Sequence, residues 1–360
     1  MRVLFANQLL GFQPGFFGGV EIQMQKTREY LKRLEVEAKF FQPSIDRIVD
    51  FDIVHLFMPW MFPSEAMKLV YYARGKGIKV VASPVFWDFF ELNYKSDLWY
   101  KKPFYVPYYL FRNVVYKYSF DFGLRTLDRY VAKVFKNSDL LLPNSDLESE
   151  LIVKMFNIDR KKVLTVPNGV DQSFAVASPR MFVEKYGLSD FILFVGRIDD
   201  PRKNVSRLIR AFDEAEINTQ LVIIGSRIGE ERSWNLNSGV RSRILHLESL
   251  PHESELLKSA YAASKVFALP SWIETPGLAA LEAAIAGANV VITDRGSTRE
   301  YFGEQVWYVD PSSVESIKTA LTEAYHSKKR PELREHILSK YTWDRVATET
   351  LKAYKKTLNE

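Results

Sequence analysis

Short runs of apolar residues alternate with longer stretches of helical periodicity along the whole chain. In the first half these runs are RVLFA, FDIVHLF, KVVASP, DLLLPNS and KVLTVPNG, and in the second half FILFVG, LVIIG, RILHLES, VFALPS and NVVITD. Their apolar residues are continuous rather than alternating, which is typical of strands buried on both faces of a parallel sheet. The pattern therefore predicts an α/β protein with two doubly wound domains, whose ligands bind at the carboxyl ends of the strands.

Breaks in this pattern divide the chain. Asn-Gly and Ser-Pro steps interrupt NGVDQSFAVASPR, so we place the domain boundary at Phe174. The expected domains are residues 1–173 and 174–342, and residues 343–360 are expected to form a helix that packs back on the first domain. The apolar residues of this last stretch are Val346, Ala347, Leu351, Tyr354 and Leu358.

Composition narrows the class of protein. With 47% hydrophobic and 26% charged residues, the 360-residue chain has the make-up of a folded globular protein and is long enough for two cores. A net charge of +5 is well below the basic footprint of a nucleic-acid-binding protein, so we expect no nucleic-acid partner. The absence of cysteine excludes disulfides and thiolate metal sites and fits a cytoplasmic protein. No apolar run approaches the roughly 20 residues of a membrane-spanning helix.

The loop after FILFVG carries two cations. Gly196 ends this predicted strand, Arg197 and Lys203 follow it, and Asn204 is expected to cap a helix from Val205 to about Ala215. Cations beside a helix N-terminus suit phosphate oxygens, because backbone amides and the helix dipole add to the side-chain charge. The alternative is a solvated loop of basic residues.

Two carboxylates stand in the apolar segment PSWIETPGLAALEAAIAG. VFALPS is a predicted strand, WIETPG its exit loop and LAALEAAIAG a helix. At about 1.5 Å rise per residue, Glu282 lies roughly 7 Å along the helix axis from Gly277, about the span from the distal end of a sugar diphosphate to its ribose. We therefore expect Glu274 to bind a sugar, the amides of Gly277 and Leu278 to face a diphosphate, and Glu282 to bind a ribose. Alternatively, Glu282 is a structural carboxylate that pairs with a neighbouring arginine.

Taken in order along the chain, these segments resemble the family 4 retaining glycosyltransferases of the GT-B fold, in which two Rossmann-like domains face each other across a cleft. The resemblance is carried by GGVE, DIVH, SDLLLPNSDLESELI, KVLTVPNGVD, FVGRIDDPRKNVSRLIRAF, YAASKVFALPSWIETPGLAALEAAIAGANVVITDRGSTRE, YVDPSSVESI and YTWDRVATETLKAYK. It implies transfer of a sugar from a nucleotide-sugar donor, with UDP- and GDP-sugars as the leading candidates. The implied acceptor is a hydroxyl of a glycan, a lipid-linked molecule or a small molecule. The first domain would bind the acceptor and the second the donor, with no cofactor and no essential metal.

The resemblance also implies roles for single residues. Arg197 and Lys203 correspond to the pair that stabilises the leaving diphosphate, and Glu274 to the carboxylate at the donor sugar; these three are the expected catalytic residues. Fixed cations of this kind stabilise the charge of a departing diphosphate and so stand in for a metal ion. The other expected donor contacts are Gly19, in a glycine loop before the first long helix, Gly196, Pro276, Gly277, Leu278 and, at the ribose, Glu282.

The chain departs from the family after the strand KVVA, where many members carry a histidine near the donor sugar. Here the sequence is SPVFWDFF, which puts Asp88 in that neighbourhood as an acceptor-side candidate. His55, at the end of FDIVH, is the second such candidate, and a packed, hydrogen-bonded histidine is the alternative. Asp50 and Asp52 match the D-x-D pattern of metal-dependent transferases, but they begin a strand without the context of those enzymes, so we expect no metal site.

Residues 98–122 hold eleven aromatic side chains interleaved with lysine and arginine. Such a segment suits a lipid headgroup boundary or a lipid-linked acceptor, and one interpretation is peripheral contact with the cytoplasmic face of a membrane. In the alternative, these rings pack under the first domain or stack on acceptor sugars.

Two other functions stay open from the sequence. One is a nucleotide-sugar epimerase or a phosphorylase-like enzyme on the same fold, and the other is a catalytically silent nucleotide-sugar binding protein. An epimerase converts its donor without any acceptor, whereas a silent protein binds the nucleotide without turnover.

Overall fold

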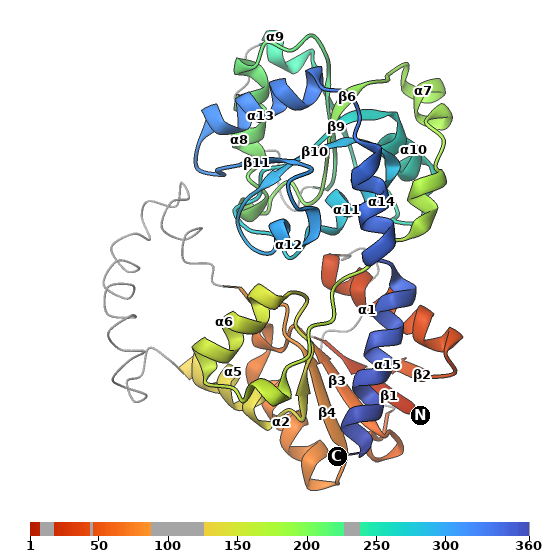
Figure 1. The fold of residues 1–360 in the computed structure, drawn as a ribbon, viewed down its shortest axis with the longest axis vertical. Coiled ribbons are helices and arrows are strands. Elements are labelled where there is room, and N and C mark those ends of the chain that lie inside the picture. Colours follow the sequence, from red (N-terminus) through yellow and green to blue (C-terminus); the bar gives the residue numbers. More distant parts are fainter. Residues whose placement is uncertain (8–17, 44–45, 88–125, 227–237, 360) are drawn as a thin grey trace. The chain divides into compact units, whose positions relative to one another are not determined.

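The computed structural model describes residues 1–7, 18–43, 46–87, 126–226 and 238–359. They form two compact units (Figure 1). The described residues from Met1 to Gly169, together with those from Trp343 onward, make up the first unit, and those of Val170–Thr342 make up the second. The division thus falls before Phe174, whose side chain is buried in the core of the second unit.

A five-stranded parallel sheet organises the first unit. Its strands, in spatial order, are β2 (Glu37–Phe40), β1 (Arg2–Ala6), β3 (Ile53–Phe57), β4 (Lys79–Ser83) and β5 (Leu140–Leu141). Its helices are α1 (Gly19–Arg33), α2 (Pro63–Gly75), α5 (Thr126–Asn137), α6 (Asp146–Phe156) and α15 (Trp343–Asn359).

Successive residues of a strand point to opposite faces of this sheet, and both faces are covered. Leu4 and Val54 belong to the core that α2 and α5 complete. Phe5 and His55 point the other way and lie against each other, and His55 also contacts Tyr354 of α15. The C-terminal helix α15 packs on α1, so the last residues of the chain cover the first strands.

A six-stranded parallel sheet organises the second unit. Its strands, in spatial order, are β11 (Trp307–Val309), β10 (Asn289–Thr293), β9 (Ser264–Leu269), β6 (Phe191–Val195), β7 (Leu221–Ile224) and β8 (Ile244–Leu247). Its helices are α7 (Arg180–Tyr186), α8 (Val205–Glu214), α9 (Ser238–Arg241), α10 (Glu255–Ala263), α11 (Leu278–Ala286), α12 (Thr298–Phe302), α13 (Val314–His326) and α14 (Pro331–Lys340). Helices α8 and α13 pack together, and α10 packs with α7 and α11.

Both sheets are parallel and doubly wound, which confirms the predicted α/β class. The run KVLTVPNG is the exception among the predicted strands, because residues 162–169 make only the isolated bridge between Val163 and Leu141. Two edge strands, β2 and β11, were not predicted from the sequence. Strand β2 is half exposed and polar at alternate positions, so it lacks the continuous apolar run of a central strand.

Candidate functional site

The strand order of the second sheet reverses at one point. Chain order runs outward from β6 through β7 and β8 on one side, and from β9 through β10 and β11 on the other. In doubly wound sheets, ligands bind outside the carboxyl ends of the two strands where the order reverses, here β6 and β9. The exit loop of β6 carries Arg197 and Lys203, and the exit loop of β9 carries Glu274.

Lys203 and Glu274 meet at this point. Lys203 Nζ lies 2.7 Å from Glu274 Oε1, and the two side chains are only 16% and 6% exposed. Burial alone would raise the pKa of the Glu274 carboxyl, but the positive charges of Lys203 and Arg202 outweigh it and hold the pKa below its usual range. Glu274 is therefore an ionised carboxylate at neutral pH, and a cation and an anion face the switch point together.

Asn204 fixes the loop that carries Lys203. Its backbone is left-handed, with φ +60°, and its buried carboxamide donates to the carbonyls of Pro270 at 3.0 Å and Pro311 at 2.8 Å. The expectation that this side chain caps the following helix is wrong, because the left-handed backbone leaves it without a cap hydrogen bond to α8. Asn204 instead ties together the exit loops of three strands, β6, β9 and β11.

A close backbone contact fixes the loop that carries Glu274. Glu274 forms a parallel bridge with Gly296, and its carbonyl accepts from the Ser297 amide at 3.1 Å. A Cβ atom at Gly296 would lie 2.1 Å from the Glu274 carbonyl oxygen, so only glycine fits there. A second close approach joins the exits of β6 and β7, because a Cβ at Gly225 would lie 1.9 Å from the Gly196 carbonyl oxygen.

Helix α11 begins directly after the Glu274 loop. Gly277 is its N-cap residue, with a left-handed φ of +88°, and no side chain caps the helix. The first hydrogen bonds to the Gly277 carbonyl come from the amides of Ala280 and Leu281, so the amides of Leu278 and Ala279 precede them. An uncapped N-terminus at a switch point suits an anionic group such as a diphosphate. The helix ends at Gly287, as predicted.

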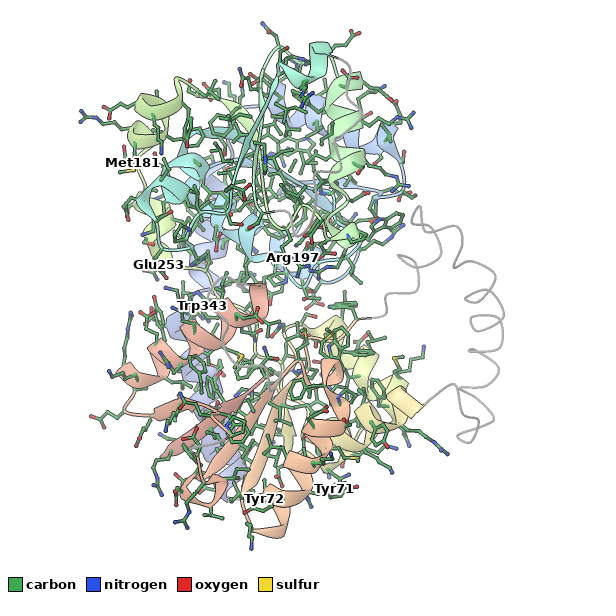
Figure 2. All side chains as sticks on the ribbon, turned by 180° about the vertical axis from the view of Figure 1, so that it is seen from behind. Tyr71, Tyr72, Met181, Arg197, Glu253 and Trp343 are labelled. Atoms are coloured by element: carbon green, nitrogen blue, oxygen red, sulfur yellow. The ribbon has the colours of Figure 1, made fainter. Side chains whose placement is uncertain are left out.

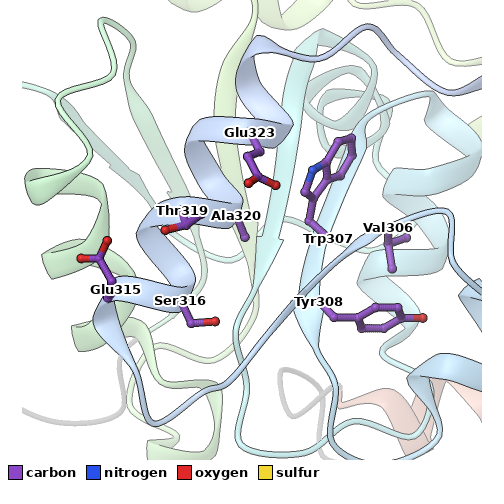
Figure 3. Close-up of a pocket in the computed structure, with 8 residues that line it drawn as sticks. All are labelled: Val306, Trp307, Tyr308, Glu315, Ser316, Thr319, Ala320 and Glu323. Atoms are coloured by element: carbon purple, nitrogen blue, oxygen red, sulfur yellow. The ribbon is translucent and has the colours of Figure 1, made fainter.

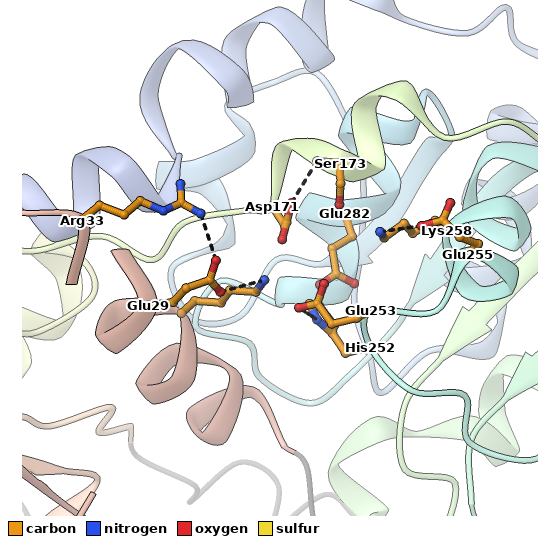
Figure 4. A network of polar contacts seen from close by, with 10 residues as sticks. Glu29, Arg33, Asp171, Ser173, His252, Glu253, Glu255, Lys258 and Glu282 are labelled. Atoms are coloured by element: carbon orange, nitrogen blue, oxygen red, sulfur yellow. Dashed lines mark hydrogen bonds and ion pairs between the residues drawn. The ribbon is translucent and has the colours of Figure 1, made fainter. Parts of the chain in front are cut away.

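Glu282 lies on α11, one turn beyond this N-terminus, and is 5% exposed. Its carboxylate Oε1 lies 2.6 Å from His252 Nε2, in the loop before α10 (Figure 4). Burial raises the pKa of the Tyr261 phenol well above 10, and the negative charge of Glu282 adds to this shift. Sequence reasoning allowed for an arginine partner and missed His252, because nothing in LPHES distinguishes this histidine from a solvated one.

Arg197 is the most exposed of the predicted site residues of this unit. This side chain, which is labelled in Figure 2, is 51% exposed, and Nε lies 3.6 Å from Asp199 Oδ1. The structure does not join it directly to Lys203 or Glu274. A half-exposed guanidinium on the β6 exit loop has the reach to approach a ligand, and its predicted role stays a prediction.

His55 is a packed histidine rather than a residue that lines a cleft. It lies within β3 rather than at its end, is 1% exposed, and stacks on Phe57. Nδ1 lies 2.6 Å from the Tyr354 hydroxyl and Nε2 lies 2.9 Å from the Ser83 hydroxyl. Burial lowers its pKa from 6.5 to about 3. The acceptor-side role suggested for His55 is therefore replaced by the packed alternative.

Gly19 lies at the start of α1. Gly19 is the first residue of the helix rather than part of the preceding loop, and Gly18 caps it, with the Gly18 amide donating to Glu21 Oε2 at 2.9 Å. The predicted role of Gly19 at the donor stays a prediction. Asp88 and the aromatic segment 98–122 lie outside the described residues.

Among the described residues, no group of three or more His, Cys, Asp or Glu side chains lies close enough to hold a metal ion. Asp52 accepts instead from the Arg2 amide at 2.7 Å. A hollow of about 390 Å³ lies between β11 and α13 (Figure 3), and it is lined by none of the predicted site residues that the structure describes.

Comparison with known proteins finds a family match in the second unit. Residues 182–340, which span most of the second unit, match the family model of glycosyl transferases group 1. The second unit thus resembles the group 1 glycosyltransferases. The O-antigen chain mannosyltransferase B of Escherichia coli is 25% identical over 289 residues, which cover 73% of this chain and 75% of that protein. A D-inositol 3-phosphate glycosyltransferase of Xylanimonas cellulosilytica is 31% identical over 46% of this chain and 43% of that protein.

Solved structures share the fold of this chain. HepE of Anabaena, solved in complex with UDP, superimposes with a TM-score of 0.69 at 14% identity and covers 99% of this chain and 100% of that one. The sucrose-phosphate synthase of Thermosynechococcus elongatus reaches 0.70 at 16% identity, over 99% and 98%. These likenesses confirm the GT-B fold with two Rossmann-like domains. The family match over residues 182–340 and the similarity to a mannosyltransferase together support the predicted activity, transfer of a sugar from a nucleotide-sugar donor.

Proposed function

We propose that this enzyme transfers a hexose from a UDP- or GDP-sugar to a hydroxyl acceptor, with retention at the anomeric carbon and without an essential metal ion. The second unit binds the donor and the first binds the acceptor. The observation that carries the proposal is the Lys203–Glu274 ion pair, which joins the exits of β6 and β9 at the switch point.

Lys203 stabilises the departing diphosphate. Its ammonium has three N–H donors, of which the bond to Glu274 uses one, so two are left for diphosphate oxygens. Arg197 adds a second cation, and the first amides of α11 add backbone donors. Donors that are already fixed by Asn204 and by the helix need no reorganisation when negative charge develops, which is how they replace a metal ion.

Glu274 orients the transferred sugar. Its carboxylate has about four acceptor sites, and Lys203 occupies one of them. The Ser271 hydroxyl interacts with the same carboxylate, and the remaining sites accept hydrogen bonds from sugar hydroxyls, because the lowered pKa keeps the group ionised. In the transfer step, the bond from the anomeric carbon to the diphosphate oxygen breaks and a bond to the acceptor oxygen forms on the same face. A diphosphate oxygen takes the proton of the acceptor hydroxyl.

The acceptor is a glycan, a lipid-linked molecule or a small hydroxylated molecule. The similarity to an O-antigen chain mannosyltransferase supports a glycan acceptor, and the similarity to D-inositol 3-phosphate glycosyltransferases supports a small one. Within the described residues, no helix combines the length and apolar content that a membrane span requires. Peripheral membrane contact through residues 98–122 and a cytoplasmic location stay predictions from the sequence.

Thermal unfolding in the presence of UDP, GDP and ADP, with and without EDTA, tests the donor site. A nucleotide at about 100 times its dissociation constant adds roughly 2.7 kcal/mol to the free energy of unfolding. We expect a shift with UDP or GDP that survives EDTA and is lost in Lys203→Ala. If none of the nucleotides raises the unfolding temperature, or if the rise disappears when EDTA is added, the proposed site is overturned. NMR of the product then reports whether the anomeric configuration is retained.

A further inference from the structure

We propose that His252 is a positioning residue that orients the Glu282 carboxylate toward the ribose of the donor nucleotide; this inference rests on the proposed function. His252 Nε2 lies 2.6 Å from Glu282 Oε1 (Figure 4). A carboxylate only accepts hydrogen bonds, so Nε2 carries the proton and donates it. His252 thereby occupies one acceptor site of the carboxylate. The buried Tyr261 phenol interacts with the same carboxylate, and the remaining acceptor sites are left for ribose hydroxyls.

Buried aromatic rings hold His252 in place. Its imidazole packs on Phe174, with 5.5 Å between ring centroids, and Phe174 packs edge-on against Tyr261 at 5.4 Å. Phe174 and Tyr261 are both in the buried core of the second unit. Glu253 Oε1 lies 3.6 Å from His252 Nδ1, on the other side of the ring. The His252 side chain is only 18% exposed, so water competes little for its bond to Glu282.

Glu282 needs such a partner in order to bind a ligand in one orientation. The last torsion of a glutamate side chain is broad, so an unpaired carboxylate samples many orientations. A hydrogen bond to one oxygen restricts this rotation before the ligand arrives. The Glu282 side chain then loses less conformational entropy when the ligand binds, so the hydrogen bond to the ligand contributes more to the affinity.

The test compares affinities for UDP and GDP with those for the matching 2′,3′-dideoxynucleotides, measured by titration calorimetry. We expect the wild-type protein to prefer the ribonucleotide about tenfold, the size of one well-placed hydrogen bond. In His252→Phe, which keeps an aromatic ring against Phe174 but lacks the donor, this preference should shrink to about twofold. Affinity for the dideoxynucleotide should change little. His252→Asn keeps a donor and should retain part of the preference.

Glu253→Gln is the matched control, because it changes the neighbouring carboxylate and leaves the bond to Glu282 intact. It should keep the wild-type preference. The positioning role would be overturned if His252→Phe kept the wild-type ratio of ribonucleotide to dideoxynucleotide affinity, or if it bound the ribonucleotide more tightly than the wild-type protein does. His252→Ala is a second variant without a donor if the phenylalanine variant does not fold. A wild-type protein that binds nucleotides without preferring ribose would also overturn it, whereas no nucleotide binding at all would overturn the proposed function itself.

Discussion

Lys203 and Glu274 are 71 positions apart in the chain, yet Lys203 Nζ and Glu274 Oε1 lie 2.7 Å apart in a shielded ion pair. Each residue stands on the exit loop of a different strand, and the two strands are neighbours in the sheet. An ion pair of this kind links stability to function, because the same charges that hold the loops together are the ones proposed to bind the donor.

Removing the lysine should destabilise the protein. In Lys203→Met, the buried Glu274 carboxylate loses its nearest positive charge, which should lower the free energy of unfolding by about 3 kcal/mol. Lys203→Arg keeps the charge and should lower it less. In the double variant Lys203→Met/Glu274→Leu, no buried charge is left unpaired, so much of the loss should be recovered. Urea unfolding measures all three, and a double variant as unstable as Lys203→Met would contradict this account.

The pH dependence of the same variant has a definite sign. In the wild-type protein the folded-state pKa of Glu274 is lowered, so its stabilising contribution is present above the unfolded pKa and is lost as pH falls. Without Lys203, burial should raise this pKa instead. The difference in the free energy of unfolding between the wild-type protein and Lys203→Met should therefore become smaller as the pH is lowered from 7 to about 4.

His55 should make the first unit sensitive to acid. Its pKa is about 3 in the folded protein, against 6.5 for the unfolded chain. The unfolded state therefore binds a proton first, so the contribution of His55 is complete above pH 6.5 and is lost as pH falls toward 3. Between pH 7 and pH 5 the loss should be about 2 kcal/mol. In His55→Gln the fall in stability over this interval should be smaller by that amount; an equal fall would show that His55 does not titrate in this way.

The parts of this fold that follow from local pattern were predictable. Continuous apolar runs identified the central strands, and the rule that ligands bind at the carboxyl ends of parallel strands pointed to Lys203 and Glu274. The edge strand β11 was not predicted, because it has only three residues. Side-chain roles that depend on partners far away in the sequence were also not predicted. Asn204 has the sequence position of a helix cap, but its partners are carbonyls 66 and 107 positions away. His252 acts through Glu282, 30 positions away, which no local pattern reports.

Two substitutions of Asn204 separate the contribution of its side-chain hydrogen bonds from that of its left-handed backbone. Asn204→Gly keeps the left-handed backbone but loses the hydrogen bonds to Pro270 and Pro311, and should lower the free energy of unfolding by about 1–3 kcal/mol. Asn204→Ala loses the same bonds, and alanine tolerates a φ of +60° less well than glycine does, so this variant should lose about 1–2 kcal/mol more than the glycine variant. Both variants should bind nucleotide more weakly, because the Lys203 loop is released. Equal unfolding free energies for the alanine and glycine variants would contradict the backbone argument.

Gly296 and Gly287 form a matched pair for testing the Glu274 loop. Both have a left-handed backbone, with φ +87° and +94°, but an alanine at Gly287 meets nothing within 4 Å, whereas at Gly296 its Cβ would lie 2.1 Å from the Glu274 carbonyl oxygen. Gly287→Ala should therefore lower the free energy of unfolding only by the backbone cost of about 1–2 kcal/mol and should leave transfer activity unchanged. Gly296→Ala has the same backbone cost and must also displace the loop. It should be clearly less stable in urea and should lose nucleotide-sugar turnover, because a displaced loop moves the Glu274 carboxylate away from Lys203. If the two variants unfold alike and turn over alike, the contact at Gly296 does not hold Glu274 in place.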